Sequence, residues 1–208
     1  MRQVRSGEGA VTVTVDDRGQ DNVLRLVSPE DHGSVHVTFR GSGNVVELGT
    51  GSAGLSARLD LGDDSRVTIG ANVRMAALEV HTERGAHIRI GTGTALTWVL
   101  RIHAHEAADV TIGERCLISD DCWITVSDMH SILDKASGRR INPARPVVIG
   151  DHVWLSNGVT VLKGAAIGAG AVIGYGSVVT GAIPAETLAV GRPAKVVRSG
   201  IVWDEALL

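Results

Sequence analysis

Aromatic side chains are scarce in this chain of 208 residues, where they make up 3% of the sequence with one phenylalanine and one tyrosine. Large aromatic rings supply much of the buried area of an ordinary globular core. A chain with so few must build its core from Val, Ile, Leu and Ala. Glycine is abundant by contrast, with 26 residues. Together these features predict a narrow core that repeats many times.

The chain also lacks an excess of one charge, a cysteine framework and a long apolar run. Its 20 Lys and Arg against 23 Asp and Glu give a net charge of −3, so nucleic acid is not an expected partner. The two cysteines, Cys116 and Cys122, suit a reducing compartment as small buried residues. No apolar run is long enough for a signal peptide, and none reaches the roughly 18 residues that a membrane span needs. We therefore expect a cytoplasmic protein without membrane insertion.

The N-terminal part, residues 1–111, contains a repeat of 21 to 22 residues. Apolar residues recur at Leu26, Leu48, Ile69, Ile90 and Ile112, and each follows another apolar residue at a distance of two. That spacing places both side chains on one face of a strand. The glycine that comes directly after the last four marks a corner.

From Ile112 the period shortens to six residues. The hexads IGERCL, ISDDCW and ITVSDM are followed, after a gap, by IGDHVW, LSNGVT, VLKGAA, IGAGAV, IGYGSV and VTGAIP. The gap, about residues 127–146, reads SDMHSILDKASGRRINPARP. Three hexads make one triangular coil of 18 residues, and the longer repeats are the same coil with a longer corner.

The sequence thus predicts an all-β protein, a parallel β-helix of about seven triangular coils with one ejected loop. We expect a single domain over residues 1–208. It would comprise longer coils over 1–111, regular hexapeptide coils over 112–187 and a C-terminal cap over 188–208. A long polar loop that leaves a regular solenoid is usually functional.

The hexads, the ejected loop and the stretch GDHVWLSNGV, residues 150–159, resemble the left-handed β-helix (hexapeptide-repeat) acyltransferases. The longer coils and the D-x-H-S-I-x-D form of the loop root look most like the capsular polysaccharide O-acetyltransferases, including those that act on polysialic acid. The resemblance implies left-handed coils and a homotrimer with an active site at each subunit cleft. It also implies direct transfer of acetyl from acetyl-CoA to a saccharide hydroxyl.

The same resemblance assigns the site residues. His130 matches the family's catalytic histidine, Trp154 its partner tryptophan, and Asn157 the residue whose backbone N–H faces the thioester oxygen. Asp128 would orient His130 or the acceptor, or would be a solvated loop carboxylate. The coenzyme A contacts fall on the last hexads and the ending GRPAKVVR, and the residues expected to make them are Tyr175, Thr180, Arg192, Lys195 and Arg198. Gly181 stands where sugar acetyltransferases often carry a lysine, and Arg192 would replace that contact.

The chemistry of the residues agrees with direct transfer. A neutral imidazole can take the proton from an attacking hydroxyl near neutral pH, and a backbone N–H at a tight corner can stabilise the oxyanion. No activated nucleophile is evident for a covalent acyl-enzyme. No metal is expected, because the H-x4-H pair of γ-type carbonic anhydrases is missing and His103 and His105 are only two residues apart.

Several alternatives remain open at this stage. The acceptor could be small, such as a nucleotide-sugar amine, serine or an antibiotic, and a non-catalytic scaffold is a weaker possibility. The loop arginines Arg139, Arg140 and Arg145 would hold an anionic acceptor or simply be solvated. Trp98 and Trp123 are expected to point outward, either for subunit packing or for stacking on a sugar.

Overall fold

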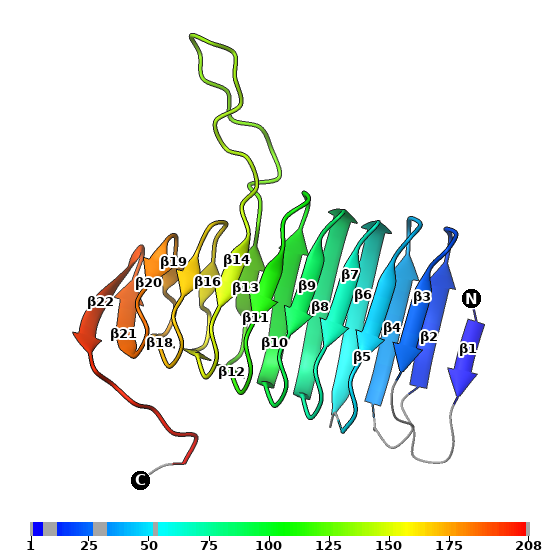
Figure 1. Ribbon diagram of the computed structural model, residues 1–208, viewed down its shortest axis with the longest axis horizontal. Coiled ribbons are helices and arrows are strands. Elements are labelled where there is room, and N and C mark those ends of the chain that lie inside the picture. Colours follow the sequence, from blue (N-terminus) through cyan, green and yellow to red (C-terminus); the bar gives the residue numbers. More distant parts are fainter. Residues whose placement is uncertain (1, 6–11, 27–32, 52–53, 207–208) are drawn as a thin grey trace.

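The computed structural model describes residues 2–5, 12–26, 33–51 and 54–206, and in these the chain forms a prism of stacked β-strands (Figure 1). A 14-stranded sheet and an 8-stranded sheet make up its faces. No helix in the described residues is long and apolar enough to cross a membrane. The role of residues 1–21 stays open, because residues 1 and 6–11 lie outside the described part.

The N-terminal coils combine long strands with short ones. The long strands of the 14-stranded sheet are β2 (Thr12–Asp17), β4 (Gly33–Phe39), β6 (Leu55–Asp63), β8 (Arg74–Arg84) and β10 (Ala95–Ala104). The short strands of the other sheet are β3 (Val23–Leu26), β5 (Val45–Leu48), β7 (Arg66–Ile69), β9 (His87–Ile90) and β11 (Val110–Ile112). The strand β10 bends over two faces of the prism, since it pairs with two separate strands of the next coil.

The C-terminal coils place three short strands on three faces. The first face carries β12 (Leu117–Ile118), β15 (Trp154–Leu155) and β18 (Val172–Ile173). The second face carries β13 (Cys122–Thr125), β16 (Thr160–Val161) and β19 (Val178–Val179). The third face carries β14 (Val147–Ile149), β17 (Ala166–Ile167) and β20 (Ala182–Ile183). Neighbouring strands within each face are parallel, which confirms the expected β-solenoid.

The core is a set of aliphatic ladders that run along the prism. On the third face the residues in register are Leu48, Ile69, Ile90, Ile112, Ile149, Ile167 and Ile183, and all are buried. Burial of each such side chain contributes about 1.5–3 kcal/mol. One continuous core cluster extends from Val13 to Ala194, so the same inward ladder supports both types of coil.

The fourth residue of each regular hexad has a backbone conformation that the sequence pattern did not reveal. Its φ is positive in seven hexads, at Arg115, Asp121, His152, Gly158, Gly164, Gly170 and Gly176. Glycine adopts this conformation without steric cost, which explains its frequency there. Glycine at the second position answers a different constraint, because a Cβ on Gly150 would lie 2.7 Å from the Ala169 nitrogen of the next coil.

The coils differ most at the corner between the second and third faces. We call this the loop corner; it consists of residues 81–87, 103–109, 127–146 and 162–165 in successive coils. Ten residues separate Ile102 from Ile112 around it, whereas six separate Val161 from Ile167. The ejected loop, residues 127–146, leaves at the same corner as an extended arm (Figure 1). Its two limbs pair through an antiparallel bridge between Leu133 and Arg140.

Both ends of the prism carry an antiparallel strand. At the N-terminal end β1 (Arg2–Arg5) pairs with β2, and at the C-terminal end β21 (Thr187–Gly191) pairs with β22 (Ala194–Ser199). Such strands cover edges that would otherwise remain open for pairing. The tail after β22 returns along the prism, where Trp203 stacks on His152 at 4.1 Å and Arg74 pairs with Glu205 at 2.9 Å.

Candidate active site

The root of the ejected loop is held to the prism by Lys163. Its ammonium donates to the Asp128 carboxylate and, at 3.0 Å, to the backbone oxygen of Asn142. The Asn142 side chain donates to Asp128 at 2.8 Å and to the backbone oxygen of His130 at 2.8 Å. The Lys163 bond, followed by the Asn142 bond, lowers the pKa of Asp128. Both limbs of the loop are therefore tied to one lysine of the following coil.

A second contact ties the loop to the preceding coil. Arg140 makes a two-pronged pair with Glu106, at 2.6 and 2.7 Å, and Ser127 donates its hydroxyl to the same carboxylate. The Arg140 bond and then the Ser127 bond lower the pKa of Glu106 to about 2. Two-pronged pairs of this kind fix orientation as well as distance. The Arg140 guanidinium is thus occupied within the chain.

His130 lies between these contacts with its backbone held and its side chain exposed. Its N–H donates to the Asp128 backbone oxygen at 2.7 Å, and its own backbone oxygen accepts from Asn142. The preceding residue, Met129, has a φ of 64°. The side chain is exposed, and no residue in the described part of the chain hydrogen-bonds the imidazole. Asp128 contacts His130 through its backbone, while its carboxylate is directed to Lys163 and Asn142.

Trp154 lies on the first face, on β15, between Leu117 and Val172 of the neighbouring coils. Its indole N–H donates to the Ser119 hydroxyl at 3.2 Å, and its ring centroid is 5.9 Å from that of Trp203. A groove runs beside it, lined by Val172, Leu188, Arg198 and the tail residues 200–202. Trp154 therefore projects outward over an apolar groove with a cation at its edge.

Asn157 and Tyr175 stack at the corner between the first and second faces. The Gly176 N–H donates to the Asn157 oxygen at 2.9 Å, and Arg192 Nε donates to the Gly176 oxygen at 2.6 Å. The Tyr175 side chain is 82% exposed. Among the described residues, none accepts a hydrogen bond from the Asn157 N–H.

The other residues expected to contact coenzyme A lie apart from this corner. Thr180 is exposed and follows β19, at the loop corner. Lys195 and Arg198 are exposed on β22, and Arg198 lines the groove beside Trp154. The structure thus brings Tyr175 close to Arg192, and Arg198 close to Trp154, but places Thr180 on another corner.

His130 and Trp154 belong to different parts of one chain. Trp154 is on the first face, whereas His130 is in the loop that follows β13 of the second face. The contacts described above for the two residues share no member. The spacing of 24 residues therefore does not by itself bring the two side chains together within one protomer.

Sequence reasoning did not identify Lys163, Asn142 or Glu106. A signal for Lys163 exists, because Ile124 pairs with Val161, which places Lys163 beside the start of the loop in the next coil. Glu106 and Asn142 carry no such signal, since their partners depend on how the loop folds back.

The tryptophans and cysteines complete the residues singled out from the sequence. Trp98 is 63% exposed, as expected, whereas Trp123 is partly buried and its Nε1 has no hydrogen-bond partner in the described chain. Cys116 and Cys122 are buried, and this burial raises the pKa of each thiol to about 11. A thiol protonated at neutral pH is a poor nucleophile, so neither cysteine is suited to form an acyl-enzyme.

Comparison with known proteins agrees with the fold. The family described as Bacterial transferase hexapeptide (six repeats) matches residues 146–181. A polysialic acid O-acetyltransferase of Neisseria meningitidis is 31% identical over 193 residues, which covers 92% of this chain and 89% of that protein. The chain belongs to the hexapeptide-repeat acetyltransferases. Its coils accordingly have the left-handed winding of that fold.

Two further relatives point to the same branch of the family. The solved structure of the polysialic acid O-acetyltransferase OatWY superimposes with a TM-score of 0.84 at 26% identity, covering 94% of this chain and 93% of that chain. A polysialic acid O-acetyltransferase of Escherichia coli O1:K1 / APEC is 39% identical over 125 residues. The match spans 40% of the length of that E. coli protein.

Proposed function

We propose that this protein transfers an acetyl group from acetyl-CoA to a hydroxyl of a saccharide, and that the saccharide is a capsular or other surface polysaccharide. The observation that carries the proposal is the loop root, where an exposed imidazole stands on a backbone fixed by Asp128 and Asn142. The likeness over nearly the whole chain to a polysialic acid O-acetyltransferase supports the substrate class.

In the proposed mechanism His130 is the general base. Its neutral imidazole accepts the proton of the acceptor hydroxyl as that oxygen attacks the thioester carbonyl. The carbonyl oxygen becomes an oxyanion, which the Asn157 N–H stabilises without reorganisation. Collapse of the intermediate expels the thiolate of coenzyme A, and the imidazolium returns its proton to that sulfur. No covalent enzyme intermediate is needed, in line with the buried, protonated thiols.

We propose that the working unit is a homotrimer in which His130 of one protomer faces Trp154 and Asn157 of its neighbour. The separate positions of these residues in one chain support this arrangement. So do the apolar side chains that the arm exposes, Met129, Ile132, Leu133 and Ile141, whose exposed fractions run from 48% to 60%. Apolar residues gathered on a projecting arm favour a second protein surface as their partner.

Coenzyme A would bind along the groove and corner near Trp154. Arg198 and Lys195 supply positive charge on β22. At the neighbouring corner Arg192 adds a further cation and Tyr175 an exposed ring. Thr180 lies on another corner, so it would contact the same coenzyme A molecule only from a neighbouring subunit. Position 181 carries a glycine where sugar acetyltransferases often carry a lysine. Arg192, which donates to the Gly176 oxygen, would supply the cation instead.

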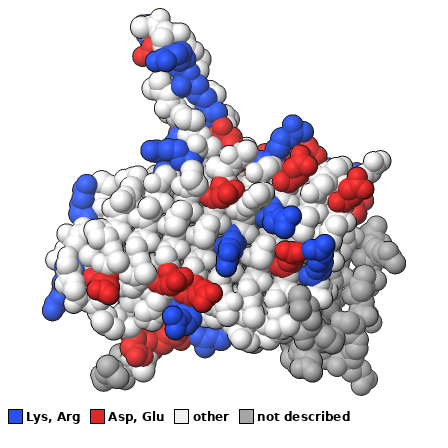
Figure 2. Space-filling view, in the orientation of Figure 1, with Lys and Arg blue, Asp and Glu red and all other residues white. Residues whose placement is uncertain are grey.

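The acceptor would bind at the arm formed by the ejected loop, where basic side chains gather (Figure 2). Arg140 is paired with Glu106, so Arg139 and Arg145 remain as the candidates for an anionic saccharide. A small acceptor is the alternative, and dependence on acceptor length separates the two. We place the reaction in the cytoplasm, where acetyl-CoA is available and free thiols stay reduced.

The test is release of free coenzyme A from acetyl-CoA in the presence of acidic and neutral oligosaccharides of graded length. We expect release that depends on an acidic acceptor, rises with its length, and disappears in His130→Ala. His87→Ala, which removes another exposed histidine, is the matched control and should retain activity. Equal release by His130→Ala would remove His130 from the mechanism. No release with any acceptor, together with no binding of coenzyme A in calorimetry, would overturn the proposal.

A further inference from the structure

Histidines and a carboxylate from two neighbouring coils meet at the loop corner, in the coils that precede the ejected loop. On β8 and β10, His81 pairs in register with His103, so that Glu83 lies opposite His105. Side chains two apart on a strand point to the same side. The two segments, HTE at residues 81–83 and HAH at 103–105, therefore present four potential ligands on one surface.

Three of these side chains are close enough to share one ion. The ligand atoms of His81, Glu83 and His105 all lie within 4.8 Å of one another, and His81 Nε2 is 2.9 Å from Glu83 Oε1. The rings of His81 and His105 have centroids 4.8 Å apart, and His103 is next to both, at 6.2 and 5.7 Å. Imidazole nitrogens with one carboxylate oxygen are the donor set that zinc prefers.

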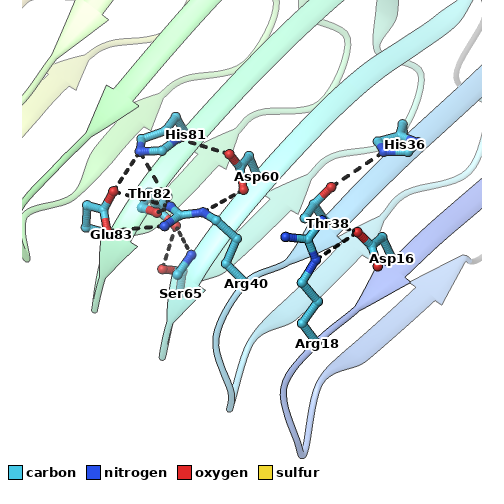
Figure 3. A network of polar contacts seen from close by, with 11 residues as sticks. Asp16, Arg18, His36, Thr38, Arg40, Asp60, Ser65, His81, Thr82 and Glu83 are labelled. Carbon is cyan, nitrogen blue, oxygen red and sulfur yellow. Dashed lines mark hydrogen bonds and ion pairs between the residues drawn. The ribbon is translucent and has the colours of Figure 1, made fainter. Parts of the chain in front are cut away.

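A contact with Asp60 orients the ring of His81. Its Nδ1 is 3.3 Å from Asp60 Oδ2, and Arg40 Nε donates to the other oxygen of Asp60 at 2.7 Å (Figure 3). A hydrogen bond from Nδ1–H to a carboxylate leaves Nε2 as the free donor to a metal, and protein metal sites commonly use this outer contact. The contact of His81 Nδ1 with Asp60 corresponds to this outer contact, and Nε2 is the atom that faces Glu83, at 2.9 Å.

Charge at the cluster also suits a cation. Asp60 and Glu83 outnumber the single guanidinium of Arg40, which the Thr82 oxygen anchors at 2.6 Å. Arg40 Nη2 also lies 3.5 Å from His81 Nε2, so this contact gives way when an ion binds.

We propose that His81, Glu83 and His105 form a binding site for one divalent transition-metal ion of the zinc class, with Asp60 as the outer partner of His81. The ion would join two coils at the loop corner. His105 directly precedes Glu106, which holds Arg140 and Ser127 of the ejected loop. The ion would therefore stiffen the corner that anchors the loop, in a structural role separate from the transfer chemistry.

The experiment uses full-length protein freed of metal with EDTA and then titrated with ZnCl2 in a calorimeter. We expect saturable binding of one ion per chain and a rise in melting temperature of several degrees. His105→Ala and Glu83→Gln should each weaken binding tenfold or more and remove the thermal shift, while melting normally in EDTA. His87→Ala is the matched control and should bind like the parent chain.

Cobalt(II) provides an independent spectroscopic readout. The parent protein should develop visible absorption bands from Co2+ bound by nitrogen and oxygen ligands, and His81→Gln should lose them. Unchanged zinc affinity in His105→Ala, loss of binding in His87→Ala instead, or no saturable binding at one ion per chain would each overturn the site.

Discussion

The N-terminal and C-terminal coils share one core but differ at one corner. The ladder from Leu48 to Ile183 is continuous through both, so the inward side chains do not distinguish them. Around the loop corner, however, the chain advances ten residues from Ile102 to Ile112 in a longer coil and six from Val161 to Ile167 in a regular coil, and one coil has the whole ejected loop. Polar contacts, such as those of Lys163 and Glu106, lie at this corner, where the longer coils and the loop-bearing coil have extra residues. The solenoid supplies the support, and the loop corner carries His130 and the proposed metal ligands.

The largest expected effect comes from giving the loop-bearing coil an ordinary corner. A Lys-Gly pair in place of residues 126–146 would restore the six-residue corner of VLKGAA between Ile124 and Ile149. We expect a folded solenoid whose acetyl transfer falls by at least about a thousandfold, because general base and acceptor contacts both disappear. Circular dichroism and coenzyme A release would measure this. Retained activity would show that the loop is dispensable.

The shared core is tested by equivalent truncations in the two regions. Ile90→Ala in a longer coil and Ile167→Ala in a regular coil remove side chains that are both buried in the same ladder. Each should lower the free energy of unfolding by about 2–5 kcal/mol. Chemical denaturation provides the comparison. A cost confined to one region would mean that the two types of coil are not supported alike.

The two buried thiols predict a loss of stability at alkaline pH. Burial raises the pKa of Cys116 and Cys122 from 9.0 to about 11, so the unfolded chain loses these protons first. Their contribution is fully present below pH 9 and disappears as pH rises toward 11, by on the order of 2 kcal/mol each. Urea unfolding at pH 8 and pH 10.5 measures it against the Cys116→Ala/Cys122→Ala double variant. Equal losses in both proteins would contradict the assignment.

The smallest expected effect concerns the hydrogen bonds that Lys163 makes with the ejected loop. Lys163→Met removes the ammonium that holds Asp128 and Asn142, and should lower kcat about tenfold with little change in melting temperature, through misplacement of His130. Lys135→Met, at an exposed position of the same loop, is the control and should be neutral. If the two variants have the same kcat, Lys163 does not position the catalytic loop.

The fold could be predicted from the sequence because its rule is local and repeated. The aliphatic positions at intervals of six identified the coils, and the break after Val126 identified the loop. The positive φ at the fourth hexad position was missed, since Arg115, Asp121 and His152 hide what glycine shows elsewhere.

The polar contacts were harder to predict because they depend on stacking between coils. Along one strand, His103 and His105 are only two residues apart and form no H-x4-H pair. The register of β8 and β10 brings Glu83 and His81 beside them, from 22 residues away. Likewise Lys163 and Glu106 reach the loop from the coils on either side of it. Aligning successive coils as stacked columns predicts that His81 lies beside His103 and that Lys163 lies beside the start of the loop. It does not predict the contact of Glu106 with the loop.

The most direct test of the account is complementation between two inactive variants. His130→Ala and Trp154→Ala would be purified separately, mixed, dissociated and reassembled, and assayed for coenzyme A release with an acidic oligosaccharide. If His130 of one protomer works with Trp154 of the next, random trimers should recover about a quarter of the parent activity, because one cleft in four has both side chains. No recovery, in mixed oligomers shown to have formed, would contradict a site built from two protomers at the ejected loop.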